Sequence, residues 1–542
     1  MTLISGGYII DGSGSPSFIG DLLFENEIIL EIKKNGARTE KNHAIENSEE
    51  REIINAEGKI ICPGFIDAHR HCDTAVFREG FGDLELKQGI TTCVAGNCGM
   101  APAPNTPETR EQYENFLMPC LGPFPREKFS SHSEYVRLLQ SAKLPLNIGF
   151  FAGMGALRVT AKGFDSSPYT KDEMKKARAL LAEASFNGAF GLSIGLMYIP
   201  EFYSDADEIA CLAKEIRGRG IIAAHMRHET NLLVSAVEEV IIIAKKAGIP
   251  LHISHFKAAG RGTWGRTLVR AIELIEKERA GGTDITVDFY PYDCGSSTLT
   301  QMIPPSYMSR GFEKAIAGLD KPDNIKWIRA LLENGEDETA RGWDNLSKTI
   351  GWDRTVISSA ALTENQKYIG KTISEATAES GAEDEIAFTA KLLFSENGKI
   401  GIINRSMSQD DIDAIARLSY SSLISDSLYG DMKTPHPRLT GAFPRFLRDF
   451  AVKRKVLTTE ECIRKMTSAP AARLGIKDKG LLSPGMRADI LVFDPDKFRD
   501  ESDYANPMKN ASGLSLCFIG GKKALEEGQV LLHNAGRFEK RQ

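Results

Sequence analysis

Short apolar runs alternate with longer amphipathic stretches through the middle of the chain. The runs are rich in Ile, Val, Phe and Ala and end at Gly or polar residues, which is typical of strands buried on both faces. The stretches between them repeat apolar residues at helical spacing. We therefore predict strands at residues 89–96, 147–153, 190–193, 221–224, 251–254 and 285–289, and helices at residues 171–184, 206–217, 232–247 and 268–276.

Repeated strand–helix units of this kind predict a parallel sheet, because each helix carries the chain back to the edge at which the next strand begins. This many consecutive units favour a (β/α)8 barrel of the TIM type, in the α/β fold class. We assign residues 61–480 to this barrel domain. Its functional groups are expected where the strands end, on the carboxyl-terminal face of the barrel.

Both ends of the chain are predicted to form short strands separated by turns. Apolar runs in residues 1–60 are broken by Gly, Asp and Asn, and residues 484–494 and 514–521 repeat that pattern near the other end. Each of these segments is too short to hold a large core alone, and chain termini often lie close together. We infer that residues 1–60 and 481–542 form one small, discontinuous β-sandwich domain.

Residues 304–353 interrupt the alternation of strands and helices. They are rich in charged residues, and their pattern predicts helices, especially at 325–333. We interpret them as an inserted subdomain or lid beside the mouth of the barrel. An exposed connector with the same composition is the alternative interpretation.

Composition and charge narrow the class of protein. The chain has 542 residues, of which 42% are hydrophobic and 26% charged, and its formal net charge is -6. This composition is ordinary for a globular protein, and the mild negative charge argues against nucleic acid or an anionic membrane as the main partner. We find no apolar run of the ~18 residues that a transmembrane helix needs, and no signal peptide. The sequence is compatible with an oligomer.

The nine cysteines indicate the compartment. They are odd in number, are scattered along the chain and include no Cys-x-x-Cys pair. In a chain of this size without an export signal, such cysteines are expected to be reduced thiols. We therefore expect a cytoplasmic protein in which at most one or two cysteines carry chemistry.

The first candidate for chemistry is a pair of histidines that follows the strand-forming residues Phe65 and Ile66, which come after a turn at Pro63-Gly64. His69 and His71 lie two residues apart, and residues two apart in an extended chain point to the same side. Their imidazoles can therefore approach one metal ion at the end of that strand. An isolated pair of this kind could also lie in a surface loop, so the interpretation depends on the rest of the chain.

Four more potential ligands follow other predicted strands. They are Cys98, His225, His255 and Asp426, and each lies at or just after a strand's carboxyl end. Thiolate, imidazole and carboxylate groups gathered at one edge of a sheet predict a site for a borderline-soft divalent metal. His252 and His255 are three residues apart, so a strand would place them on opposite sides. We choose His255 as the ligand because it lies at the strand end and is followed by Lys257. His252 is expected in the core or behind the ligands.

The chain resembles the amidohydrolase superfamily and, within it, the N-acyl-D-amino-acid deacylase (D-aminoacylase) family. The resemblance extends over nearly the whole chain, and its most specific motif is Gly96-Asn97-Cys98-Gly99. It implies zinc-dependent hydrolysis of the amide bond of N-acyl-D-amino acids to a carboxylate and a free D-amino acid. The other matching segments are residues 63–71, 191–198, 224–229, 254–257, 288–292, 425–426, 436–445 and 484–489.

The resemblance also implies roles for single residues. Cys98, His225 and His255 would hold a tightly bound Zn²⁺, while His69 and His71 would hold a weaker second metal or complete the shell. Asp426 would act as the general base and then the general acid. The residues implied in substrate binding are Tyr198, Lys257, Tyr290, Ser296 and the carboxylate-binding Arg438. Tyr292 and Ser297 are the alternative registers for Tyr290 and Ser296.

The sequence departs from the family pattern and leaves other functions to weigh. Met154 stands where family members usually carry a histidine, and Ser427 stands in place of a common Gly, which bears on side-chain preference and on D-selectivity.

An amidohydrolase of cyclic amides, like a hydantoinase or dihydroorotase, is the second hypothesis. The presence of Cys98, and the lack of a bridging lysine at 147–153 and 190–193, argue against it. A non-catalytic protein with the same fold is the third, and the retained ligands and Asp426 argue against that.

Overall fold

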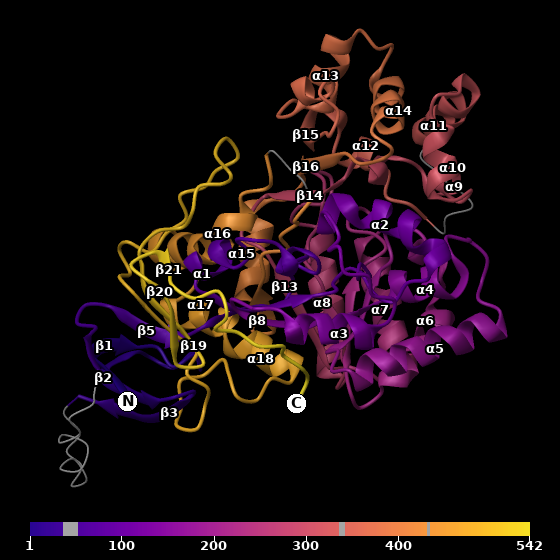
Figure 1. Ribbon diagram of the computed structural model, residues 1–542. Coiled ribbons are helices and arrows are strands. Elements are labelled where there is room, and N and C mark those ends of the chain that lie inside the picture. The colour runs from indigo at the N-terminus through magenta and orange to yellow at the C-terminus, as the bar shows by residue number, and fades with distance from the viewer. Residues whose placement is uncertain (36–51, 335–341, 431–433) are drawn as a thin grey trace.

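The computed structural model describes residues 1–35, 52–334, 342–430 and 434–542. Its centre is built from two parallel sheets (Figure 1), one with the strand order β6-β7-β8 and one with the order β17-β13-β12-β11-β10-β9. The strands are β6 (Phe65–Asp67), β7 (Ile90–Ala95), β8 (Asn147–Phe150), β9 (Ala152–Gly153), β10 (Gly191–Gly195), β11 (Ile221–His225), β12 (Leu251–Ile253), β13 (Ile285–Phe289) and β17 (Ser421–Leu423).

Hydrogen bonds join the two sheets at both seams. At the first seam, β8 and β9 are parts of one strand position interrupted at Phe151, whose N–H donates to the Ala95 carbonyl at 2.9 Å. At the second seam, between β17 and β6, Asp426 N donates to the His69 carbonyl and His71 N to the Ser427 carbonyl, each at 2.9 Å. With β8 and β9 counted as one position, the sheets supply eight strands. The predicted (β/α)8 barrel fold is confirmed.

Amphipathic helices cover the outside of this barrel. In α7, the apolar residues Leu233, Val237, Val240 and Ala244 recur every three or four positions and are buried, and the helix ends at Gly248 in the left-handed conformation. The helices of the barrel are α1 (Asp83–Lys87), α2 (Pro107–Leu121), α3 (His132–Ser141), α4 (Met154–Lys162), α5 (Lys171–Phe186), α6 (Ala206–Ala213), α7 (Leu233–Ala247), α8 (Thr267–Ala280), α15 (Gln409–Arg417), α16 (Arg438–Phe446), α17 (Thr459–Met466) and α18 (Ser468–Leu474).

Strands from the two ends of the chain pair in one nine-stranded sheet. Its order is β21-β20-β19-β18-β5-β1-β2-β3, and β4 pairs with β1. β18 pairs with β5 on one side and β19 on the other, so indigo and yellow segments lie side by side in Figure 1. The strands are β1 (Thr2–Ile9), β2 (Phe18–Glu25), β3 (Ile28–Lys34), β4 (Glu52–Asn55), β5 (Ile60–Pro63), β18 (Ile490–Phe493), β19 (Leu514–Ile519), β20 (Lys522–Glu526) and β21 (Gln529–Val530).

A fourth sheet belongs to a segment between β13 and β17 that departs from the barrel. β14 (Cys294–Thr298) and β15 (Thr355–Ser359) both pair antiparallel with β16 (Gly401–Arg405). The segment therefore runs from 294 to 405 and is longer than the predicted 304–353, because its first and last strands pair with each other. Its helices are α9 (Pro305–Met308), α10 (Phe312–Ala317), α11 (Pro322–Asn334), α12 (Leu346–Thr349), α13 (Ile373–Ser380) and α14 (Glu385–Ser395).

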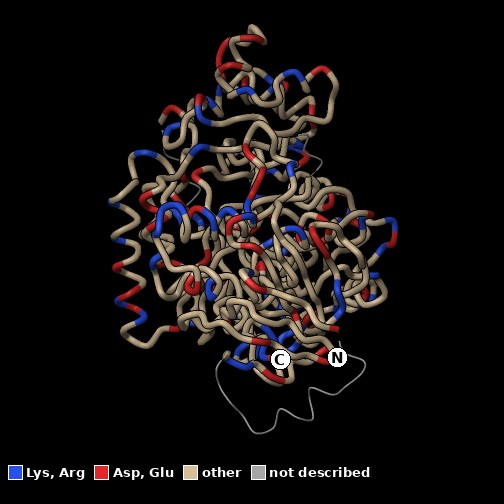
Figure 2. Tube along the Cα trace, turned by 90° about the vertical axis from the view of Figure 1, so that its left-hand side faces the viewer, with Lys and Arg blue, Asp and Glu red and all other residues tan. Residues whose placement is uncertain are grey.

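Figure 2 shows acidic and basic residues interspersed over the molecule. Among the helices of the described residues, none combines the length and the apolar character needed to cross a membrane.

A buried ionic network ties the β17–β6 seam to α1. The guanidinium of Arg70 is fully buried and donates to Asp67 Oδ2 at 3.2 Å, to Glu85 Oε1 at 2.6 Å and to Tyr429 Oη at 2.6 Å. Asp67 also accepts a hydrogen bond from Ser425 N at 3.0 Å. One cation therefore joins β6, α1 and the chain that follows β17.

Replacing Arg70 by leucine is expected to destabilise the fold strongly. The substitution leaves the Asp67 and Glu85 carboxyl groups buried without their partner, which typically costs about 3–5 kcal/mol. Thermal unfolding should show a midpoint lower by several degrees. The matched control is Arg137→Leu, since the Arg137 side chain is 71% exposed. Equal midpoints for the two variants would show that the network does not stabilise the seam.

Candidate metal centre

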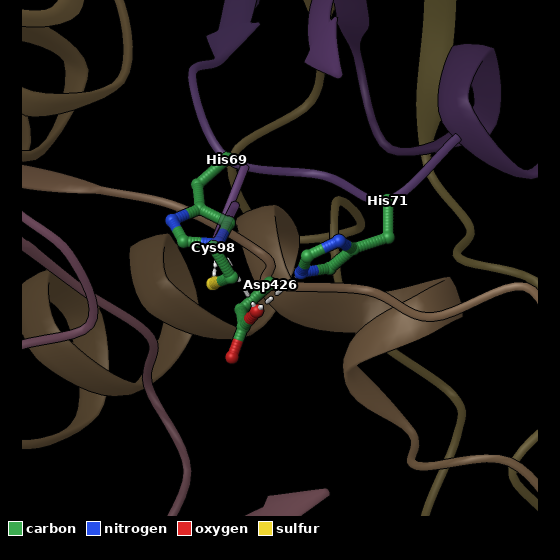
Figure 3. A group of neighbouring side chains, drawn as sticks. All are labelled: His69, His71, Cys98 and Asp426. Atoms are coloured by element: carbon green, nitrogen blue, oxygen red, sulfur yellow. Dashed lines mark hydrogen bonds and ion pairs between the residues drawn. The ribbon is translucent and has the colours of Figure 1, made fainter. Parts of the chain in front are cut away.

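Six potential ligands gather at the carboxyl ends of five barrel strands. His69 and His71 follow β6, and Cys98 follows β7. His225 is the last residue of β11, His255 follows β12, and Asp426 follows β17. All six residues are buried. Figure 3 shows that the side chains of His69, His71, Cys98 and Asp426 point toward one another.

Three of these residues have an unusual backbone conformation. Cys98, His255 and Asp426 have φ angles of 54°, 35° and 52°, in the left-handed region that side-chain-bearing residues rarely adopt. Each such residue costs on the order of 1–3 kcal/mol, and such strain is typical of functional sites. At Gly96, before Cys98, a Cβ atom would lie 2.1 Å from the Phe151 carbonyl oxygen, so only glycine fits there.

The distances define two groups that share one thiol. Cys98 Sγ lies 3.2 Å from His69 Nε2 and 3.4 Å from His255 Nε2. Asp426 Oδ1 lies 3.4 Å from the Nε2 atoms of both His69 and His71. The ligand atoms lie within 4.8 Å of one another in each of two groups, which are His69, His71, Cys98 and Asp426, and Cys98, His225 and His255.

The buried histidines fit a metal site. Both ring nitrogens of His225 are buried without a hydrogen-bond partner among the described residues. A buried polar atom without a partner is costly, and coordination to a metal would remove that cost. The thiol and imidazoles suit zinc or a similar divalent ion, and the carboxylate of Asp426 is compatible with it.

Burial and neighbouring charges set the protonation states of the Cys98 thiol and the His225 imidazole when no metal is bound. Burial, reinforced by Asp426, raises the pKa of the Cys98 thiol well above its usual value. Burial and the neighbouring His255 hold the pKa of His225 well below its usual value, so this imidazole is neutral. Metal ligation requires a thiolate and neutral imidazoles. His225 is therefore ready for a cation, whereas Cys98 needs one in order to ionise.

Asp426 is kept charged by an arginine. Burial alone would raise the pKa of Asp426, but Arg438 and His71 hold it well below the usual range. The Arg438 Nη1 atom lies 2.9 Å from Asp426 Oδ2. Arg438, predicted to anchor the substrate, therefore also pairs with the predicted general base.

Asp288 supports the ligands, a role that the sequence interpretation did not assign. Its carboxylate, on β13, accepts a hydrogen bond from His255 N and lies 3.6 Å from His69 Nδ1 and 2.8 Å from His252 Nε2. His252 is thus placed behind the ligands. The available signal was a carboxylate within an otherwise apolar predicted strand at 285–289.

Glu229 and Lys257 form a second support, beside His255. Lys257 Nζ donates to Glu229 Oε1 and lies 3.0 Å from His255 Nδ1, and Glu229 Oε1 also lies 3.0 Å from His255 Nδ1. Burial would raise the pKa of Glu229, but Lys257 and the nearby histidines lower it, so the carboxylate is charged. Lys257 was predicted to contact substrate, and the structure also gives it this internal partner.

A pocket with about 670 Å³ of space, its open mouth included, adjoins these ligands. We call it the metal pocket. Of the five predicted substrate contacts, four line it, namely Tyr198, Lys257, Tyr290 and Ser296. The fifth, Arg438, is buried next to Asp426, which lines the pocket. Tyr290 lies under the Arg438 guanidinium at 4.8 Å, whereas the alternative Tyr292 donates a hydrogen bond to the Pro437 carbonyl. Ser296 and Ser297 both line the pocket.

Potential metal ligands at the carboxyl-terminal face of a (β/α)8 barrel are suited to metal-assisted hydrolysis. The Amidohydrolase family model matches residues 52–507, most of the chain. The protein therefore belongs to the amidohydrolase family and is a metal-dependent amidohydrolase.

Three similar proteins support the resemblance to the deacylases. An N-acyl-D-aspartate deacylase of Alcaligenes xylosoxydans xylosoxydans is 29% identical over 540 residues, covering 98% of this chain and 94% of that protein. A solved D-aminoacylase described with a binuclear metal centre matches with a TM-score of 0.81 and 26% identity, covering 99% of both chains. The N-acyl-D-glutamate deacylase of Bordetella bronchiseptica, solved with zinc and a phosphonate inhibitor, matches with a TM-score of 0.80 and 26% identity, covering 100% of this chain and 99% of that one.

Removing the shared thiol is expected to empty the centre. The purified protein should hold at least one divalent metal per chain after dialysis, and Cys98→Ala should lose most of it, because Cys98 belongs to both ligand groups. Elemental analysis measures the metal. Cys211→Ser is the control, since Cys211 is a half-buried cysteine outside both groups. Full metal content in Cys98→Ala would exclude the thiol as a ligand.

Proposed function

We propose that the protein hydrolyses the amide bond of N-acyl-D-amino acids and releases a carboxylate and a free D-amino acid. The observation that carries this proposal is the Asp426–Arg438 pair beside the two ligand groups. It places a charged carboxylate for proton transfer next to a guanidinium suited to a substrate carboxylate. The names of the similar deacylases support both the linear amide and the D configuration.

Zinc is the metal that we propose. Cys98, His225 and His255 would hold it tightly, while His69, His71 and Asp426 would complete the shell or hold a second, weaker ion. A bound divalent zinc polarises the amide carbonyl and lowers the pKa of water to roughly 7. The support for zinc is the sulfur and nitrogen donor set, together with the zinc in the related N-acyl-D-glutamate deacylase.

Asp426 would move the proton. Its carboxylate, kept ionised by Arg438, takes a proton from the attacking water and then passes it to the leaving amine nitrogen. A general base must be ionised at the working pH, and a low pKa ensures this. The same proton serves both steps, so water is split into a hydroxyl on the acyl product and a hydrogen on the amine.

Arg438 would bind the α-carboxylate of the substrate. Its Nη1 atom is paired with Asp426, but its Nε atom is buried without a hydrogen-bond partner among the described residues. A planar guanidinium with a free donor edge suits a carboxylate. Tyr198, Tyr290, Ser296 and Lys257 would add hydrogen bonds from the walls of the metal pocket.

A substrate panel tests the proposed reaction. It contains N-acetyl-D-amino acids, their L enantiomers, a hydantoin and dihydroorotate, and amine or acid release is measured with the zinc-loaded protein. We expect turnover of the D series and much slower turnover of the L series. Turnover of only the hydantoin or dihydroorotate would replace the proposal by the cyclic-amide hypothesis.

Asp426→Asn is expected to reduce kcat by about 10²- to 10⁴-fold, the range in which general acid–base groups contribute. The amide has nearly the same shape but cannot accept the proton. Zinc content is measured in parallel, because Asp426 also lies among the ligands. Asp323→Asn is the control, with a side chain that is 99% exposed. An unchanged kcat in zinc-loaded Asp426→Asn would remove Asp426 from the reaction.

A further inference from the structure

An apolar cavity opens from the metal pocket and has no part in the chemistry described so far. It has about 790 Å³ of space, its open mouth included. We call it the annex. It lies between the barrel helix α2 and the segment from 294 to 405, whose residues form much of its wall. The residues that line both cavities are Met100, Cys120, Met197, Tyr198, Gln301 and Leu346.

The inner wall of the annex is made of aromatic and aliphatic side chains. Phe116 and Phe312 lie edge to face, with ring centroids 5.5 Å apart, and Phe202, Ile303 and Met308 are buried around them. Methionine side chains, of which the annex has three in addition to these rings, adapt to a flexible apolar ligand. Such a surface favours a hydrocarbon chain.

The charged residues in the annex already have partners. Arg227 donates to Glu239 Oε1 at 2.8 Å and to the Ser204 carbonyl at 2.9 Å. Asp344 accepts hydrogen bonds from the N–H groups of Glu229 and Thr230, at 2.7 and 3.0 Å. Neither residue therefore needs a charged ligand, and the annex is suited to an uncharged one.

The annex joins the metal pocket at the metal-ligand end. The Tyr198 ring lies 4.8 Å from the His225 ring, and Met100 follows Cys98 by two residues. Tyr290 and Ser296, next to Arg438, line the metal pocket but not the annex. The two ends of the substrate are therefore directed to different surroundings.

This arrangement distinguishes the two halves of an N-acyl amino acid. In this orientation the α-carboxylate lies at Arg438 and the amide carbonyl lies at Cys98 and His225. The acyl chain attached to the carbonyl carbon then points toward the mouth of the annex. The amino-acid side chain is attached to the Cα atom, one bond from the carboxylate, and therefore stays in the metal pocket. The acyl group is thus the part of the substrate that reaches the annex.

We propose that the annex binds the acyl chain and that the protein prefers N-acyl-D-amino acids with a medium-length aliphatic acyl group over N-acetyl ones. This inference rests on the proposed function, because it assumes the orientation set by Arg438 and the ligands. Burying one methylene group contributes about 0.8 kcal/mol, or about fourfold in an equilibrium constant. Acyl chains that fill the annex should therefore raise kcat/KM steeply.

The test is a series of N-acetyl, N-butanoyl, N-hexanoyl and N-octanoyl derivatives of one D-amino acid, measured with the zinc-loaded full chain. We expect kcat/KM for the hexanoyl compound to exceed that for the acetyl compound by at least about tenfold. Equal or falling values along the series would overturn the inference while leaving the proposed function standing. No turnover of any member of the series would instead refute the proposed function.

A variant that narrows the annex locates the effect. Thr300 lines the annex and not the metal pocket, so Thr300→Trp should lower the ratio of hexanoyl to acetyl kcat/KM at least about fivefold. Thr300→Ser keeps the hydroxyl and should keep the ratio.

N-acetyl derivatives of D-alanine, D-leucine and D-phenylalanine form the second arm. If Thr300→Trp changed the preference among these side chains and not among the acyl chains, the annex would bind the side chain and the inference would fail. The acyl series on the unaltered protein remains decisive if Thr300→Trp does not fold.

Discussion

The hydrogen bonds across the β17–β6 seam are the constraint on which the site depends. His69 and His71 lie on one side of this seam and Asp426 on the other, and two backbone hydrogen bonds of 2.9 Å fix their relative positions. The buried Arg70 network secures the same seam from within. Because one ligand group combines residues from both sides, closing the barrel and assembling that group are the same event.

The site combines local backbone strain with unsatisfied polar groups. Cys98, His255 and Asp426 adopt left-handed conformations just after their strands, and His225 has two buried ring nitrogens without hydrogen-bond partners in the described part of the chain. Both features cost free energy, so the surrounding barrel must offset them. Asp288 and Glu229 hold His255 on two sides, which keeps its ring aimed at Cys98. The barrel thus supplies rigidity to a cluster that would not be stable alone.

The segment between β13 and β17 contributes a different property. The barrel supplies the ligand atoms, whereas this segment supplies Ser296 in the metal pocket and Ile303, Met308 and Phe312 in the annex. The potential metal ligands therefore come from the barrel alone, whereas the walls of both cavities combine residues of the barrel and of this segment.

The sequence by itself determined the class of fold and the ligand types. Strand–helix periodicity predicted the barrel, because burial on both faces and helical spacing are local properties of the chain. The position of Cys98, His225 and His255 after apolar runs singled them out, because parallel strands end at one edge.

Only the tertiary structure decided how these groups meet. The sharing of Cys98 between two ligand groups, the pairing of Arg438 with Asp426 and the support from Asp288 all join residues far apart in the chain. The tertiary structure also decided the extent of the segment from 294 to 405. The sequence-based bounds were too short, because β14 and β16 are far apart in the chain and pair only in the folded protein. Distances between distant residues depend on packing, and no local pattern in the sequence encodes them.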